Sequence, residues 1–246
     1  MSIKHKHSPQ IHTVTGPAAA LPLLLSDERQ SSLLDVGCGT GTWLKAAIEF
    51  GIFDVYGVDG VEIPPNELHI PIEKIQQLDL TRPWNLHKRF DVALCLEVAE
   101  HLNGTSAPIL IDALIKHADR IYFSAACPGQ SGQHHVNCQW PAYWQKLFND
   151  RGYVCSDSAR WRIWEDTRIE AWYRQNMFVA RRDAAAAGHE PRIKEIVHPE
   201  MLSLVLPETE RFESHVKRIE DGHMELMWYL KTPMFAFSKK FKRKLR

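Results

Sequence analysis

The length, composition and charge of the chain limit the kind of protein it encodes. Its 246 residues suit one α/β domain with appendages and allow a sizeable buried core. Lys and Arg total 30 and Asp and Glu total 30, so this is not a protein that coats nucleic acid through bulk positive charge. No apolar run approaches the roughly 20 residues of a membrane-spanning helix, which excludes a transmembrane role.

The amino-terminal region contains a short apolar stretch that only faintly imitates a secretion signal. Two lysines precede apolar residues 17–25, but Pro17 and Pro22 interrupt this stretch and a strand motif follows at once. We therefore expect no cleavage there. The five irregularly spaced cysteines favour reduced thiols and a cytoplasmic location.

Apolar runs alternate with helical patterns along most of the chain, which is typical of strands joined by crossover helices. The predicted strands are residues 32–36, 54–58, 75–80, 90–96, 120–125, 153–159 and 176–181. Helical spacing predicts helices over residues 42–50, 107–118 and 141–149. The expected fold class is therefore α/β, with a doubly wound, mostly parallel sheet of seven strands.

Three segments are predicted along the chain. Residues 1–31 form a helical or irregular amino-terminal segment, and residues 32–182 form the sheet domain. The sequence RDAAAAG at 182–188 predicts a short tether into a helical extension, residues 183–246, which ends in a basic tail. Apolar residues of this extension recur at helical spacing, namely Phe212, Val216, Ile219, Leu226 and Leu230.

The strongest local signal is a glycine-rich turn that follows the first predicted strand in the sequence DVGCGTG. Glycines permit tight backbone geometry and let a ligand approach main-chain N–H groups. Thr42 stands where a dinucleotide-binding fingerprint requires its third glycine. Asp59 ends the second strand, 20 residues after Gly39, at the distance where a carboxylate accepts hydrogen bonds from ribose hydroxyls.

The motifs DVGCGTG, GVDG, LDL and FDVALCLEVAEHL, in this order, resemble the class I S-adenosylmethionine (SAM)-dependent methyltransferases over about residues 33–181. The resemblance implies a Rossmann-like methyltransferase fold, with SAM as cofactor and S-adenosylhomocysteine (SAH) as product. In this family the glycine loop holds the amino acid end of SAM, the acid after the second strand takes the ribose, the LDL segment lines the adenine, and the end of the fourth strand closes over the methionine moiety. The cofactor-binding residues implied are Asp35, Gly37, Cys38, Gly39, Asp59, Gly60, Asp79, Leu80, Leu96 and Glu97.

The EVAEH stretch raises the question of a metal. Glu97, Glu100 and His101 would share one face of a helical turn, and oxygen-rich ligation would suit magnesium or manganese. Some members that methylate vicinal hydroxyls or RNA ends use such a set. The same pattern is widespread among relatives that need no metal, so we expect none and prefer a structural or cofactor-gating role.

The polar loop at residues 127–141 follows the fifth predicted strand, where loops carry function on a rigid scaffold. It resembles a G-x-x-H-[VI]-N-E-Q pattern of bacterial methyltransferases associated with sugar and polysaccharide biosynthesis, although Cys138 replaces the acid. We predict His135 as general base, with His134 in reserve. The predicted substrate-binding residues are Asn137, Gln139 and Trp140. Alternatively, these polar residues only cap the following helix and tie down the loop.

Positive charge is concentrated in two later regions of the chain. Arg160, Arg162, Arg168 and Arg174 lie among aromatic residues and either meet a substrate phosphate or form a solvated face. Six of the last eight residues are basic and follow aromatic side chains, which favours peripheral contact with the inner face of an anionic membrane. An exposed tail without a membrane partner is the alternative, and nucleic acid is not an expected partner.

Together these patterns predict a SAM-dependent O-methyltransferase that acts on a sugar or glycan hydroxyl. One alternative is a metal-dependent methyltransferase of small molecules or RNA ends. The other is a non-catalytic SAM-binding assembly protein.

Overall fold

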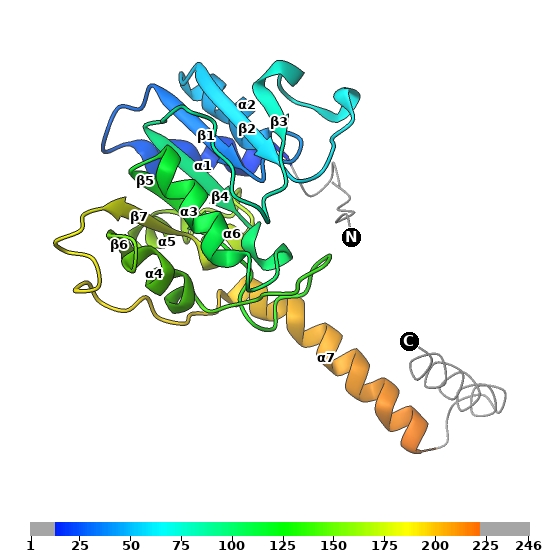
Figure 1. Ribbon diagram of the computed structural model, residues 1–246. Helices are drawn as coiled ribbons and strands as arrows, with labels where there is room; N and C mark the ends of the chain where they lie inside the picture. Colours follow the sequence, from blue (N-terminus) through cyan, green and yellow to red (C-terminus); the bar gives the residue numbers. More distant parts are fainter. Residues whose placement is uncertain (1–12, 222–246) are drawn as a thin grey trace, which may run out of the picture. The chain divides into compact units, whose positions relative to one another are not determined.

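A single seven-stranded sheet organises the chain, whose computed structural model describes residues 13–221. The strand order is β3-β2-β1-β4-β5-β7-β6 (Figure 1). The strands are β1 (Ser32–Val36), β2 (Asp54–Asp59), β3 (Ile75–Gln77), β4 (Val92–Leu96), β5 (Arg120–Ser124), β6 (Tyr153–Ser156) and β7 (Phe178–Arg182). Strands β1 to β5 run parallel, whereas β7 is antiparallel to both β5 and β6. The predicted doubly wound, mostly parallel sheet is confirmed.

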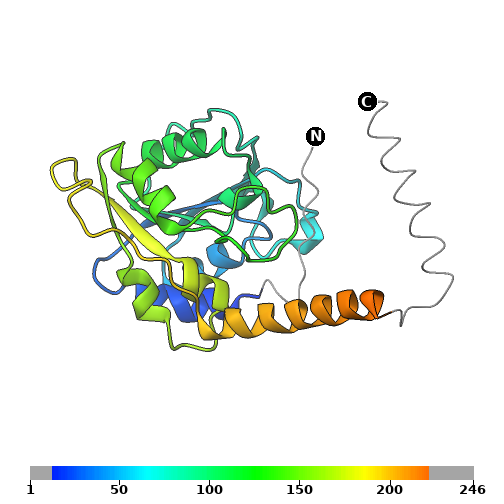
Figure 2. The ribbon, with the colours of Figure 1, turned by 90° about the horizontal axis from the view of Figure 1, so that it is seen from below.

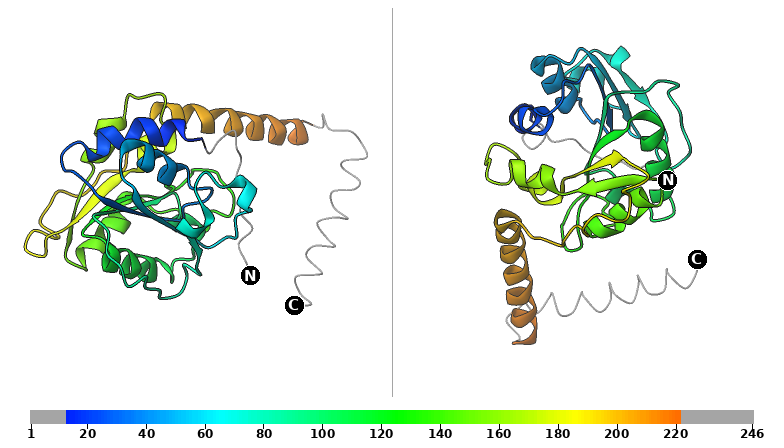
Figure 3. Two further views of the ribbon diagram at one scale, coloured as in Figure 1. Left: turned by 90° about the horizontal axis from the view of Figure 1, so that it is seen from above. Right: turned by 90° about the vertical axis from the view of Figure 1, so that its left-hand side faces the viewer.

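Helices cover both faces of this sheet (Figure 2). The helices are α1 (Thr15–Leu25), α2 (Thr42–Phe50), α3 (Ala107–His117), α4 (Pro141–Asn149), α5 (Ser158–Ile163), α6 (Ala171–Asn176) and α7 (Pro199–Glu220), with short 3-10 helices η1 (Pro65–Glu67), η2 (Ile72–Lys74) and η3 (Ala99–His101). Apolar side chains of α3 and α4 pack on one face of the sheet. Those of α1, α2 and α5 pack on the other, where α1 lies beside α2 (Figure 3).

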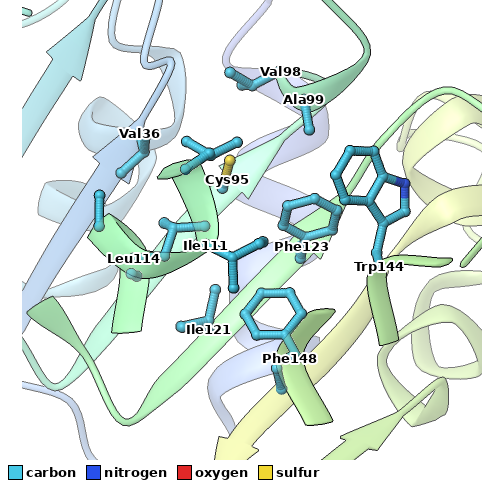
Figure 4. Packing of buried hydrophobic residues seen from close by; sticks show 14 of the residues in the cluster. Val36, Cys95, Val98, Ala99, Ile111, Leu114, Ile121, Phe123, Trp144 and Phe148 are labelled. Atoms are coloured by element: carbon cyan, nitrogen blue, oxygen red, sulfur yellow. The ribbon is translucent and has the colours of Figure 1, made fainter. Parts of the chain in front are cut away.

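The central strands are buried on both faces, which explains their continuous apolar sequences. All five residues of β4 and of β5 are buried. Phe123 of β5 contacts Trp144 and Phe148 of α4, with ring centroids 5.2 and 5.5 Å apart (Figure 4). This aromatic cluster fixes α4, and with it the end of the polar loop that precedes α4.

Several predicted strand boundaries are wrong, and the predicted strand 90–96, for example, begins at Val92. The predicted strand 75–80 ends at Gln77. The predicted strand 153–159 ends at Ser156, whose hydroxyl accepts a hydrogen bond from the Ser158 amide as the chain turns into α5. The last strand begins at Phe178 because residues up to Asn176 belong to α6. Helices α2 and α4 have the predicted bounds.

The sequence beyond β7 contributes to two compact units. The first unit continues to Met201, and its segment 189–201 is held by Glu190, which accepts hydrogen bonds from Gln145, Asn149 and the Cys155 amide. The second unit begins at Leu202 and carries most of α7. The predicted helical positions Leu226 and Leu230 and the basic tail lie outside the described residues, so a membrane contact stays a prediction. None of the helices within residues 13–221 is both long and apolar enough to cross a membrane.

Candidate functional site

The glycine loop after β1 can form only because its residues accept a left-handed backbone. Gly37, Gly39 and Gly41 have φ angles of 77°, 51° and 81°. A Cβ atom on Gly37 would lie 2.2 Å from the Val98 side chain. A larger residue is therefore excluded at this position both by its left-handed backbone and by this clash. The amides of Gly37 and Cys38 donate to the Val58 carbonyl, which fixes the loop against β2. The Cys38 side chain is buried in the core rather than exposed in the loop.

Two buried carboxyl groups flank this loop. Asp59 accepts hydrogen bonds from the amides of Gly39 and Val61, both at 2.8 Å, and thereby holds the loop beside the end of β2. Asp35 is 3% exposed, and within the described part of the chain its Oδ2 atom has no hydrogen-bond partner. Burial, and then the Asp59 carboxylate, raise the pKa of Asp35 to about 8. This pair of acids therefore favours a ligand that brings positive charge.

The segment predicted to line an adenine lies next to Asp59. The Leu78 amide donates to the Asp59 carbonyl at 2.8 Å, and a Cβ on Gly60 would lie 3.8 Å from the Leu78 carbonyl oxygen. Leu80 is buried. The Asp79 carboxylate is half-exposed and accepts hydrogen bonds from the Thr81 amide and hydroxyl, so it also stabilises its own turn.

Glu97 has a strained backbone and a firmly held carboxyl group. It directly follows Leu96, the last residue of β4. Its φ angle is 55°, a left-handed value that costs a non-glycine residue about 1 kcal/mol or more. Gln130 donates to this carboxyl at 2.9 Å and Asn176 at 3.1 Å. Burial raises the pKa of Glu97 to about 7, opposed by hydrogen bonds from Asn176, Ser124 and Gln130. Strain and a shifted pKa together are typical of functional sites.

Sequence reasoning missed the two amides that hold Glu97. Asn176 ends α6, and its side chain also donates to Gln130 at 2.9 Å. The neighbouring Gln175 side chain contacts the Cys127 sulfur. For Asn176 the only sequence signal is its amide neighbour Gln175, and the strand predicted over residues 176–181 hides that signal.

The EVAEH stretch does not form the α-helical turn that the spacing predicts. Glu97 lies before η3, which covers Ala99–His101. The structure instead groups Glu100 and His101 with His135, because ligand atoms of these three residues all lie within 4.8 Å of one another. Glu100 is 0% exposed, and its pKa is raised well above the usual value by burial and then by the Glu97 carboxylate. Such a group matches the donors of a divalent-cation site.

The polar loop brings His135 to this acidic end of the sheet. The amides of Val136 and Asn137 both donate to the Glu100 carbonyl, at 2.9 and 3.0 Å, and the ring of His135 lies 5.1 Å from that of His101. The Nδ1 atom of His135 lies 3.1 Å from the Gln130 carbonyl oxygen. If Nδ1 carries the proton, the lone pair of the neutral ring is on Nε2.

The other loop residues predicted to act in catalysis or substrate binding are not part of the group formed by Glu100, His101 and His135. His134 is exposed and has a φ angle of 55°. The Asn137 side chain is buried and accepts a hydrogen bond from Gln139 at 3.1 Å. Trp140 immediately precedes α4 and is partly exposed. The structure thus brings a ring nitrogen of His135 within 4.8 Å of the Glu100 carboxyl group and leaves His134 at the surface.

The ionisation of Asp35 gives a testable pH dependence. The pKa of about 8 lies above the unfolded value of 3.8, so the stability that this group contributes is complete below 3.8 and is lost as pH rises towards 8. An Asp35→Asn variant cannot ionise here. We expect its advantage in unfolding free energy over the ligand-free parent protein to grow by roughly 1 kcal/mol per pH unit between about pH 5 and about pH 8. Chemical denaturation across this range measures it, and an advantage independent of pH would contradict the assignment.

The fold is shared, at low sequence identity, with a solved bacterial methyltransferase domain. The methyltransferase domain of bacterial CtHen1-C gives a TM-score of 0.50 at 16% identity, covering 69% of this chain and 98% of that chain. DesVI of Streptomyces venezuelae gives 0.49 at 15% identity, covering 69% and 91% respectively. The plantazolicin methyltransferase BpumL, crystallised with SAH, gives 0.46 at 15% identity, covering 69% and 83%.

The sequence itself identifies the family. No curated protein matches the chain significantly. The family profile described as Methyltransferase domain, however, matches residues 11–173, which include the glycine loop, Asp59, Glu97 and the polar loop. The match covers more than half of the chain, and the protein therefore belongs to the Methyltransferase domain family.

Proposed function

We propose that the protein is a SAM-dependent methyltransferase whose cofactor lies at the carboxyl ends of β1, β2 and β4. The observation that carries this proposal is the buried Asp35 carboxyl group, which has an unpartnered Oδ2 atom and lies near Asp59 beside a glycine loop. SAM brings an ammonium and a sulfonium group, and these positive charges suit a buried pair of acids. Asp59 ends β2 at the carboxyl end of the parallel strands, the position from which a carboxylate accepts hydrogen bonds from ribose hydroxyls.

We propose a hydroxyl group of a sugar or glycan as the methyl acceptor. When bound, SAM supplies an electrophilic methyl group. His135 Nε2 takes the proton of the acceptor hydroxyl, while Nδ1 donates to the Gln130 carbonyl and keeps the ring oriented. Gln130 therefore serves two roles, because its side chain also holds the Glu97 carboxyl group. Asn137, Gln139 and Trp140 support sugar recognition by their position around this loop, and aromatic side chains with polar edges suit sugar rings.

A second candidate function is a metal-dependent methyltransferase of small molecules or RNA ends. The observation that favours it is the convergence of Glu100, His101 and His135 within 4.8 Å. Both carboxylate oxygens of Glu100 are buried, and neither has a hydrogen bond of ordinary geometry among the described residues, which suits the donor set of a metal ligand. In that case the Glu100 carboxylate and the lone pairs of His101 and His135 would hold magnesium or manganese.

Calorimetric titration with SAM and SAH, with and without EDTA, tests the proposal. We expect binding of micromolar affinity or tighter, followed by SAH production with an acceptor found among nucleotide sugars and glycans. Absence of SAM binding would overturn the assignment of the glycine loop. Binding without SAH production from any acceptor would instead support a non-catalytic SAM-binding protein.

Manganese titration followed by electron paramagnetic resonance separates the two candidate functions without an activity assay. Stoichiometric manganese binding that is lost in Glu100→Gln would favour the metal-dependent enzyme. Activity that EDTA leaves unchanged, with no bound manganese, would favour His135 as a base.

A further inference from the structure

Arginine side chains converge on a cavity at the amino end of β5. The cavity measures about 230 Å³ and lies between the end of α1, α5 and strands β5 to β7. The lining side chains that concern us are Arg120, Arg162, Arg181, Tyr122, Ser156 and Ser158. Arg120 begins β5, whose last residue, Ser124, accepts a hydrogen bond from the Glu97 amide. Arg120 is thus at the end of β5 opposite to the glycine loop and Glu97, and the strand spans roughly 13 Å from Arg120 to Ser124.

The charges around this cavity do not balance. Glu28 pairs with Arg120 at 3.2 Å and with Arg181 at 2.8 Å, while Asp27 pairs with Arg162. Three guanidinium groups therefore share two carboxylates, which leaves one positive charge in excess. Both carboxylates are about half-exposed and follow the end of α1, so water screens these ion pairs and weakens them.

Arg120 has unused hydrogen-bonding capacity. Its side chain is 6% exposed, and its Nη2 atom donates to the Tyr122 hydroxyl at 2.6 Å and to the Leu24 carbonyl at 3.3 Å. Its buried Nε–H group has no acceptor within the described part of the chain. The N–H groups of a buried guanidinium normally all donate hydrogen bonds. Because the Nε–H group of Arg120 has no acceptor among the described residues, this buried cation favours an anionic ligand beside it.

Size and geometry narrow the class of anion. The volume is below the roughly 300–1,000 Å³ of sites for drug-sized ligands, which leaves room for a small anion. The arginines come from three different elements, β5, α5 and β7, whereas a planar carboxylate uses a single guanidinium fork. A tetrahedral phosphate presents oxygens in several directions and matches this arrangement, and the hydroxyls of Ser156 and Ser158 add donors.

We propose that this cavity binds a phosphate group, either as inorganic phosphate or as part of a small phosphomonoester, through Arg120, Arg162 and Arg181. The phosphate displaces Asp27 from Arg162 when it binds. The site is separate from the cofactor site, so its occupancy does not require SAM.

Calorimetry and phosphorus NMR on the full chain without SAM test this site, with inorganic phosphate and glycerol 3-phosphate as the two probes. We expect saturable binding that weakens by at least about tenfold when Arg162→Gln and Arg181→Gln are combined. Both side chains are more than a third exposed, so the double variant should fold, as its unfolding midpoint will show. Equal affinity for the two probes would assign free phosphate, and tighter binding of glycerol 3-phosphate would assign a monoester.

Two further variants separate a built site from general positive charge. Arg182→Gln is the matched control, because Arg182 follows Arg181 in β7 but pairs with Asp119 and does not line the cavity. It should leave phosphate affinity unchanged. Asp27→Asn should raise the affinity, since it removes the carboxylate that competes for Arg162. The proposal fails if neither the parent protein nor Asp27→Asn binds either probe saturably, if Asp27→Asn binds more weakly, or if Arg182→Gln loses affinity to the same extent as the double variant.

Discussion

Replacing His135 by Ala should lower turnover by about 100-fold or more while SAM affinity stays unchanged. The reason is positional. The Nδ1 atom of His135 lies 3.1 Å from the Gln130 carbonyl oxygen, and its ring lies beside His101 at the acidic end of the sheet. The variant removes the group that takes the proton but touches neither Asp35 nor Asp59. SAH formation and SAM calorimetry, measured on the same preparation, check the two halves of this expectation.

The control for this variant is His189→Ala. His189 is exposed in the loop after β7 and should be replaced without any effect on turnover. Full activity of His135→Ala would show that the polar loop is only structural. A loss of turnover together with a loss of manganese binding would favour the metal-dependent alternative, whereas loss of turnover alone supports the base.

Replacing Asp59 by Ala should weaken SAM binding by about 100-fold, the equivalent of one or two charge-assisted hydrogen bonds. The change removes the acceptor proposed for the ribose hydroxyls and also releases the amides of Gly39 and Val61, which the Asp59 carboxylate holds at 2.8 Å. Calorimetric titration with SAM gives the affinity directly. Unchanged affinity would show that the ribose lies elsewhere.

Two companion variants make the Asp59 result interpretable. Asp59→Asn keeps the size of the side chain and one oxygen acceptor, so it should preserve the loop better and lose less affinity than Asp59→Ala. Asp54→Ala is the matched control, because Asp54 begins the same strand, lies far from the loop and pairs with Lys88 at 2.6 Å. It should bind SAM as the parent protein does.

The sheet and the glycine loop were predictable because each depends on local sequence. Continuous apolar runs such as Val92–Leu96 become strands buried on both faces, and only glycine fits a φ of 77° in contact with Val98. The carboxyl ends of parallel strands then meet at one edge, which brings Asp35 and Asp59 together without further information.

The acidic network was not predictable, because it depends on contacts between distant segments. Asn176 and Gln130 reach Glu97 from α6 and from the polar loop, and nothing in their local sequence indicates this meeting. The spacing of Glu97, Glu100 and His101 also suggested a helical face that the left-handed backbone of Glu97 breaks. His135 joins the group through loop contacts, which spacing along the chain does not encode.

The left-handed backbone of Glu97 also bears on how this protein would respond to selection. Glycine adopts a φ of 55° without strain, and Glu97→Gly would also remove a buried carboxyl group next to Glu100. Laboratory evolution guided only by heat resistance would therefore favour changes at this position early. Selection for thermal stability and selection for activity therefore act in opposite directions at Glu97. A screen that scores only survival on heating would replace residues of the candidate site before it changed residues of the sheet.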